Sequence, residues 1–144
     1  MPEVPTPRLV ALLAALDAVP AEDVPHWAAH WLIAGHDGDA LRTLAGLSGS
    51  DPGDVRDVLE DALADCGVTI PDADVAAAAL SLTHLARMFA DGRAGSRWVV
   101  QKAAEIVADS PPDAVAGLPL ARLTDDSDDA EVSRACADHL ATWG

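Results

Sequence analysis

Residues 118–137 read LPLARLTDDSDDAEVSRACA, and this stretch decides the fold that we predict. An apolar helix end comes first, an acidic turn follows, and a second amphipathic helix begins after Asp128 with Glu131 and Val132. Residues 41–59, LRTLAGLSGSDPGDVRDVL, repeat this order of helix end, acidic turn and new helix. A repeated helical hairpin predicts stacked helix pairs, because one hairpin cannot bury its own apolar stripe.

Apolar residues recur at helical spacing along the chain, whereas the alternation that is typical of strands is absent. The last predicted helix shows this stripe at Val132, Ala135, Cys136, His139, Leu140 and Trp143. Capping residues, prolines and glycines divide the chain into eight helices. We therefore predict an all-α fold without a sheet, as one domain over residues 1–144. Its four hairpins are expected at about residues 6–35, 39–67, 72–109 and 113–144.

The second helices of these hairpins are predicted to begin at Asp23, Asp51, Ser96 and Asp128. An apolar residue follows each of these positions four residues later. The end of the chain resembles a HEAT repeat, whose second helix commonly begins with an acidic turn and a Glu-Val-Arg phrase. Asp128, Glu131 and Val132 match that pattern, and the arginine is displaced to Arg134. The resemblance covers about half of the chain and implies a short right-handed α-solenoid of the HEAT or armadillo type. It also implies a binding scaffold without catalytic residues.

The chain is strongly acidic: 24 Asp and Glu oppose 9 Lys and Arg among 144 residues, for a formal net charge of −15. Such a field repels nucleic-acid backbones and anionic membranes, and it attracts cationic partners. No apolar run approaches the roughly 20 residues of a membrane span, and the amino terminus lacks the basic region of a signal peptide. Cys66 and Cys136 have no CxxC spacing. We expect a cytoplasmic protein with reduced thiols and no cofactor.

The densest acidic surface is predicted on the helix that begins at Asp51. Its members recur at spacings of three and four residues on the solvent side: Asp54, Asp57, Glu60, Asp61 and Asp65. The HEAT resemblance implies that second helices line one inner surface, which extends this face to Gln101 and Glu105. From this face we predict a non-enzymatic protein–protein interaction module for a basic protein or peptide. A more specific version of this prediction is an immunity or inhibitor protein. An alternative is a regulatory or structural subunit of a larger assembly.

A metal-binding function is a further alternative. His26 and His30 lie one turn apart on one predicted helix, and His36 follows just beyond the end of that helix. Histidines at this spacing suit zinc or copper. The competing interpretation is an exposed polar face beside a buried stripe that contains Trp27 and Trp31.

Two other groups of residues are interpreted as structural. Cys136 and His139 resemble a nucleophile and its base, but both lie in the apolar stripe of the last helix, which predicts core residues. The acids of residues 125–131 resemble a calcium loop in composition only, because the central glycine and the distal glutamate are missing. Helix capping explains them better. Trp143, near the end of the chain, leaves dimerisation through terminal repeats as an open alternative.

Overall fold

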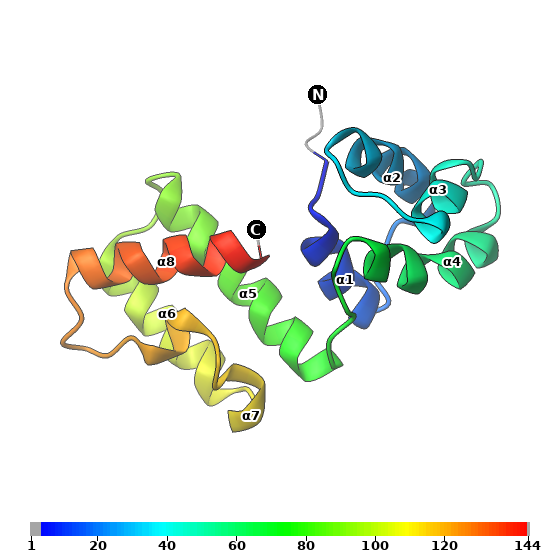
Figure 1. Cartoon of the computed structure of the whole chain (residues 1–144). Helices are drawn as coiled ribbons and strands as arrows, with labels where there is room; N and C mark the ends of the chain where they lie inside the picture. Colours follow the sequence, from blue (N-terminus) through cyan, green and yellow to red (C-terminus); the bar gives the residue numbers. More distant parts are fainter. Residues whose placement is uncertain (1–3, 144) are drawn as a thin grey trace. The chain divides into compact units, whose positions relative to one another are not determined.

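The structure is a computed structural model that describes residues 4–143 of the chain. Those residues form eight α-helices and two short 3-10 helices, with no strand among them, which confirms the all-α prediction (Figure 1). None of the helices in this described part combines the length and the apolar character that crossing a bilayer requires. The chain divides into two compact units, Met1–Pro71 and Asp72–Gly144, each with its own buried core.

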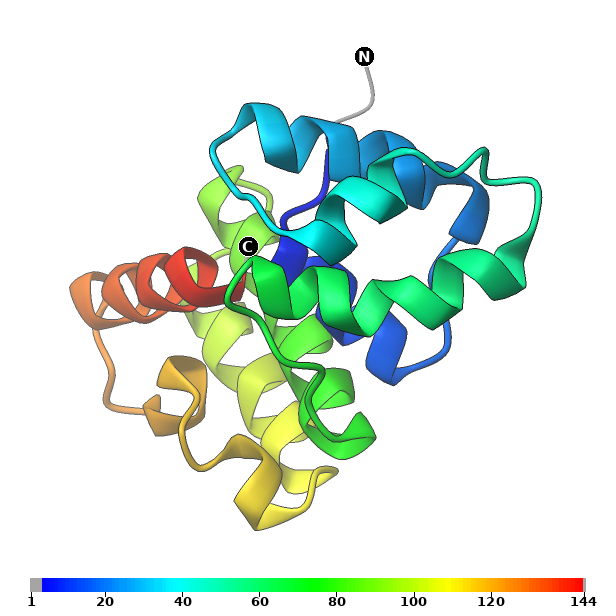
Figure 2. The same ribbon diagram turned by 45° about the vertical axis from the view of Figure 1, so that its right-hand side comes forward.

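Unit 1 contains α1 (Pro7–Ala15), a 3-10 helix (Ala21–Asp23), α2 (Val24–Ile33), α3 (Asp39–Ala45) and α4 (Pro52–Asp65). α3 packs against both α2 and α4, and α1 packs against α4. Figures 1 and 2 both show the short α3 between the two longer helices. The buried faces carry small and aliphatic side chains, and Leu12, Leu41, Leu44 and Leu63 are fully enclosed among them.

Local capping chemistry sets the ends of α1 and α4. The Thr6 hydroxyl accepts a hydrogen bond from the N–H of Leu9 at 3.2 Å. The Asp51 carboxylate accepts from the first N–H groups of α4 at 3.0 and 3.4 Å. After α4, Gly67 takes a left-handed φ of +77°, and the N–H of the buried Val68 turns back to the last turn of the helix. These caps satisfy backbone groups that the helix ends would leave unpaired.

Two contacts hold the loops of unit 1 in place. The indole N–H of the buried Trp31 donates to the carbonyl oxygen of Pro5 at 2.9 Å. Gly49 is buried, has a φ of +78°, and packs against the backbone of Glu22. A Cβ atom at this position would lie 2.7 Å from the Glu22 carbonyl oxygen. The turn before α4 therefore requires glycine, both for its left-handed backbone and for the close approach.

Unit 2 contains α5 (Ala73–Ala90), α6 (Ser96–Ala108), α7 (Pro112–Val115), a 3-10 helix (Pro119–Arg122) and α8 (Asp129–Trp143). α8 crosses α5 and packs against it, and α6 packs against α5 (Figure 1). The predicted stripe of the last helix is confirmed: Val132, Ala135, Cys136 and His139 are buried, and Leu140 and Trp143 are partly buried. Small residues on α5, such as Ala79, allow close contact between these helices.

A buried polar cluster lies within the core of unit 2. The Thr83 hydroxyl donates to the Ala79 carbonyl oxygen at 2.7 Å. The Nε2 atom of His139 lies 2.8 Å from that hydroxyl and 3.2 Å from the same carbonyl, so the imidazole carries its proton on Nε2 and donates to both. Its Nδ1 atom is buried without a hydrogen-bond partner among the described residues. Burial lowers the pKa of His139, which keeps the ring neutral near pH 7.

The helices predicted to begin at Asp23, Asp51, Ser96 and Asp128 start at or directly after those residues, but only two of the four residues cap their helix. Ser96 does not cap α6: it is the first residue of the helix, Gly95 precedes it, and no side chain bonds to the first turn. Asp23 likewise makes no capping bond, because a 3-10 turn leads directly into α2. Asp128 does act as a cap, since its carboxylate accepts from the N–H of Glu131 at 2.8 Å. The stacking of four hairpins as a solenoid over residues 1–144 stays a prediction.

Candidate functional site

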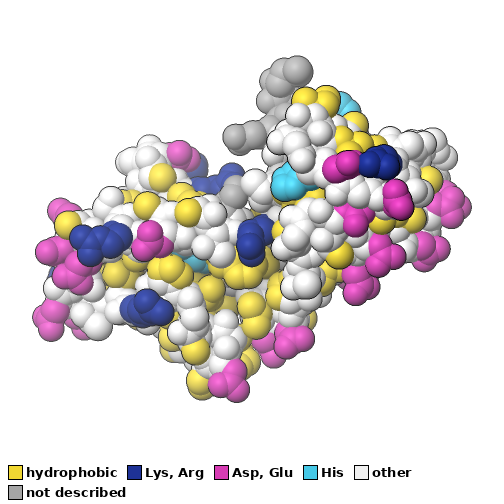
Figure 3. All heavy atoms as spheres, in the orientation of Figure 1, with side chains coloured by type: hydrophobic (Ala, Val, Ile, Leu, Met, Phe, Trp, Pro, Cys, Tyr) yellow, Lys and Arg dark blue, Asp and Glu magenta, His cyan; other side chains and the backbone are white. Residues whose placement is uncertain are grey.

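Helix α4 presents acidic side chains to solvent because its apolar residues occupy the opposite side. Val55, Leu59, Ala62 and Leu63 are buried in the core of unit 1. Four exposed carboxylates on the remaining surface form what we name the α4 acidic face: Asp54, Asp57, Glu60 and Asp61. Figure 3 shows Asp and Glu side chains gathered over the part of unit 1 that holds α3 and α4. The predicted acidic surface is therefore an exposed face of one helix.

Few cations neutralise this face from within its own unit. Residues 1–71 hold twelve acidic residues and three arginines. Arg42 is engaged elsewhere: its guanidinium donates to Asp37 at 2.7 and 2.9 Å and lies 3.4 Å from Asp39. Hydrogen bonding to Arg42 holds the pKa of Asp37 below its ordinary value, and the same bonds raise the pKa of Arg42. Among residues 4–143, the four carboxylates of the α4 acidic face form no salt bridge.

The charges along this face repel one another. Asp57 lies three residues from both Asp54 and Glu60 and four residues from Asp61. Each like-charge pair at such spacing costs roughly 0.2–0.5 kcal/mol of helix stability. Arg56 is the nearby cation on the same helix, and it forms no salt bridge within the described residues. The helix thus keeps an unfavourable charge arrangement that its packing does not require, and a cationic partner would relieve it.

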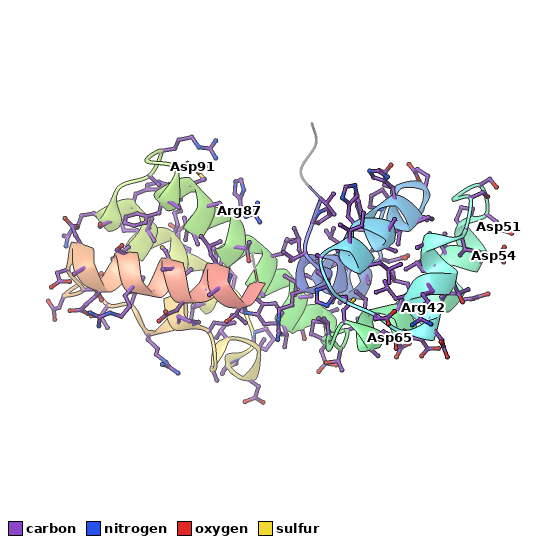
Figure 4. The ribbon with its side chains drawn as sticks, turned by 45° about the horizontal axis from the view of Figure 1, so that its top comes forward. Arg42, Asp51, Asp54, Asp65, Arg87 and Asp91 are labelled. Atoms are coloured by element: carbon purple, nitrogen blue, oxygen red, sulfur yellow. The ribbon has the colours of Figure 1, made fainter. Side chains whose placement is uncertain are left out.

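Asp65, predicted as a fifth member of this surface, makes a contact within the fold. Its carboxylate accepts a hydrogen bond from the N–H of Leu41 at 3.1 Å. It thereby caps α3, whose own capping residue, Gly38, has no side chain. A Cβ atom at Gly38 would collide with this carboxylate. Figure 4 shows Asp65, at the end of α4, close to Arg42 of α3. We therefore do not count Asp65 in the α4 acidic face.

A pocket of about 220 Å³, here named the α4 pocket, opens beside this face. Its apolar lining comes from Ala14, Val19, Ala21, Val55, Leu59 and Ile70. Asp17, Arg56 and Glu60 add charge, and Glu60 belongs to both the pocket and the α4 acidic face. Asp17 lies two residues beyond the end of α1 and has a left-handed φ of +53°, a conformation that aspartate tolerates better than most residues. Sequence reasoning missed this pocket because three separate stretches of the chain line it, residues 14–21, residues 55–60 and Ile70.

Gln101 and Glu105 belong to α6 and therefore to unit 2, not to the unit that holds α4. Both side chains are exposed. Glu105 already has a cationic neighbour, because the Lys102 ammonium lies 3.1 Å from its carboxylate. The same ammonium lies 6.0 Å from the centre of the Trp98 ring. The extension of the acidic surface to these two residues stays a prediction.

The structure brings together two of the three histidines that were considered as metal ligands. The Nε2 atoms of His26 and His30 are 3.2 Å apart on α2, and both side chains are exposed. His36 does not complete a three-ligand set. Within the described part of the chain, no three His, Cys, Asp or Glu side chains are grouped to hold one metal ion.

The Cys136 and His139 pair is confirmed as part of the core. Both side chains are buried in unit 2, and the imidazole is bonded to Thr83 and Ala79. Burial raises the pKa of the Cys136 thiol to about 11. A buried thiol with such a pKa is a poor nucleophile, because the thiolate is the reactive form.

A second pocket, of about 230 Å³, lies in unit 2. Two arginines, Arg122 and Arg134, contribute to its lining, and so do two acids, Glu131 and Asp138. Neither sign of charge prevails there. This balance gives the pocket no clear preference for an anion or a cation, in contrast to the α4 acidic face.

Comparison with known protein families, with characterised proteins and with solved structures gives no match for this chain. The features that bear on function are therefore those of the chain's own residues. Among them, the α4 acidic face and the adjoining α4 pocket combine uncompensated charge with an accessible apolar recess.

Proposed function

We propose that the protein is a non-enzymatic interaction module that binds a basic protein or peptide on the α4 acidic face. The observation that supports this most strongly is a row of four exposed carboxylates without salt-bridge partners in the described residues, beside a pocket with an apolar lining. Complementary charge speeds encounter and discriminates between partners. An apolar anchor that is buried in a pocket supplies much of the affinity of an interface. Helix α4 carries the acidic face and contributes Val55, Leu59 and Glu60 to the pocket.

The lining of the α4 pocket narrows the chemistry of the expected anchor. Val55, Leu59 and Ile70 favour an aliphatic or aromatic side chain. Glu60 and Asp17 favour positive charge next to that side chain. We therefore expect the partner to present an apolar residue that is flanked by lysine or arginine.

Two more specific forms of the proposal use the same surface. An immunity or inhibitor protein would cover a basic enzyme or toxin, and the formal net charge of −15 supports that form through long-range attraction. A regulatory or structural subunit would hold a basic segment of a larger assembly. The stacking of the helical hairpins as a short right-handed α-solenoid is also part of the proposal, but binding at the α4 acidic face and the α4 pocket does not require that stacking.

Reversing the charge of the α4 acidic face is expected to abolish partner capture. The variant Asp57→Lys/Glu60→Lys/Asp61→Lys replaces three exposed carboxylates by ammonium groups, so that attraction to a basic partner becomes repulsion. Immobilised wild type and variant are incubated with lysate of the source organism at low and at high salt, and bound proteins are quantified. Wild type should capture a basic protein, less of it at high salt, and the variant should capture none of it.

The matched control reverses three acids in unit 2 that make no side-chain bond among the described residues: Asp109→Lys/Asp125→Lys/Asp126→Lys. This control changes the net charge by the same amount as the α4 variant. A difference in capture between the two variants would therefore come from the α4 acidic face and not from the overall charge. The control should keep most of the capture. Equal loss in both variants, with folding verified by circular dichroism, would contradict a binding face on α4.

A further inference from the structure

The imidazoles of His26 and His30 form a preorganised pair on the exposed side of α2. Their Nε2 atoms are 3.2 Å apart, and the rings meet edge to face with centroids 4.6 Å apart and planes at 76°. Neither ring has another hydrogen-bond partner among the described residues. The helix alone sets this geometry, because residues four apart project from the same side one turn apart.

We propose that this pair chelates one divalent transition-metal ion, Cu²⁺ or Zn²⁺, through its two Nε2 atoms. Imidazole nitrogens bind zinc at about 2.0–2.1 Å. Two such bonds to atoms 3.2 Å apart enclose an angle of about 100°. That angle lies between the values of square-planar copper and tetrahedral zinc sites. The distance between the two Nε2 atoms therefore suits one ion, and rotation of the exposed side chains would turn both lone pairs toward it without a change in the backbone of α2.

Metal binding sets the protonation of both rings. Each Nε2 must present its lone pair to the ion, so each neutral ring must carry its proton on Nδ1. In the metal-free pair, the hydrogen bond between the rings requires a proton on one of the two Nε2 atoms. That proton leaves Nε2 when the ion enters, and the same ring takes up a proton from water at Nδ1. Both rings are exposed, so water can carry out this exchange.

The surroundings favour a cation and leave its site open. Residues 1–71 carry a formal charge of −9, from twelve acidic residues and three arginines. Glu22 and Asp23 directly precede α2. No third protein ligand is grouped with the pair in the described residues, so water completes the coordination of the ion. This arrangement is an exchangeable two-ligand site, unlike the four-ligand zinc sites that hold folds together. It is independent of the proposed function, because the α4 acidic face supplies no ligand.

The test is calorimetric titration of the untagged full chain with CuCl₂ and with ZnCl₂ near pH 7.5. Wild type should bind one equivalent of at least one of these ions. His26→Ala and His30→Ala should each lower the affinity at least about tenfold, because a single imidazole loses the benefit of simultaneous binding. His36→Ala and His84→Ala are the controls and should keep wild-type affinity. All these side chains are fully or partly exposed, so the variants should fold.

Spectroscopy of the copper complex gives a second readout. Electron paramagnetic resonance should show coupling to two imidazole nitrogens in wild type and to one in either single variant. Full affinity in His26→Ala or His30→Ala, or no binding by wild type, would overturn the site. An equal loss in His36→Ala would replace it by a three-histidine site and overturn the two-ligand geometry.

Discussion

Replacing His139 with alanine is expected to lower the free energy of unfolding by about 3 kcal/mol. The ring is fully buried in unit 2, where its Nε2 atom donates to Thr83 and to Ala79. Alanine removes these hydrogen bonds and leaves a cavity between α8 and α5. The measurement is urea unfolding followed by far-ultraviolet circular dichroism. Amide hydrogen exchange of α5 and α8 should show the loss of protection in the same variant.

His139→Leu is the matched control for this variant. Leucine refills most of the volume and removes Nδ1, a buried acceptor without a partner among the described residues. Thr83 still donates to Ala79 in this variant. We therefore expect the leucine variant to stay within about 1 kcal/mol of wild type. A leucine variant as unstable as the alanine variant would contradict this account of the cluster.

The buried His139 also predicts that the stability of the folded protein decreases in acid. Burial lowers the pKa of His139 in the folded state below its ordinary value of 6.5. Well above pH 6.5 the ring is neutral in both states, so it does not make the stability depend on pH. As the pH falls below 6.5, the unfolded chain takes up a proton first. Stability then falls by up to about 1.4 kcal/mol per pH unit until the folded-state pKa is reached. Unfolding of wild type and His139→Leu from pH 7.5 to 4.5 measures this difference, and parallel curves would contradict it.

Gly49→Ala is expected to destabilise unit 1 by about 3 kcal/mol. Its φ of +78° is left-handed, which costs a residue with a Cβ about 1 kcal/mol. The added Cβ would also lie 2.7 Å from the carbonyl oxygen of Glu22, so backbone must move. Overpacking of this kind costs about 2 kcal/mol. Urea unfolding, with hydrogen exchange of α2 to α4, measures the loss.

The variant Gly67→Ala separates the cost of the left-handed backbone from the cost of the contact with Glu22. Gly67 has nearly the same φ, +77°, but a Cβ there would meet no atom within 4 Å. This variant should therefore cost only about 1 kcal/mol. Equal destabilisation by the two substitutions would show that the contact with Glu22 contributes nothing.

The helices could be predicted because their signals are local. The spacing of apolar residues identified the helices. Side chains directly before the helix starts, such as Thr6, Asp51 and Asp128, do cap those helices. α6 begins at Ser96 as predicted, but Ser96 does not cap it, since a capping hydroxyl must come from the residue before the helix, and Gly95 occupies that position. Which helices pack together depends on contacts between distant residues, and periodicity does not report those contacts.

For the candidate site too, local features could be predicted from the sequence and contacts between distant residues could not. The exposed carboxylates of α4 could be predicted because one helix determines their spacing. The role of Asp65 as a cap for α3 could not, because Leu41 lies 24 residues away in the chain. The same holds for Thr83 and His139, which are separated by 56 residues. The His26 and His30 pair was visible in the sequence, but its ring geometry required the structure.

The most direct measurement of the binding claim is site-specific photo-crosslinking from α4. A photoreactive amino acid replaces Asp57 in one variant and Asp109, on the surface of unit 2, in another. After irradiation in lysate of the source organism, the variant labelled at position 57 should form a covalent adduct with one basic protein. The variant labelled at position 109 should form none. An adduct from position 109 alone, or from neither position while the protein still captures its partner, would contradict a binding face on α4.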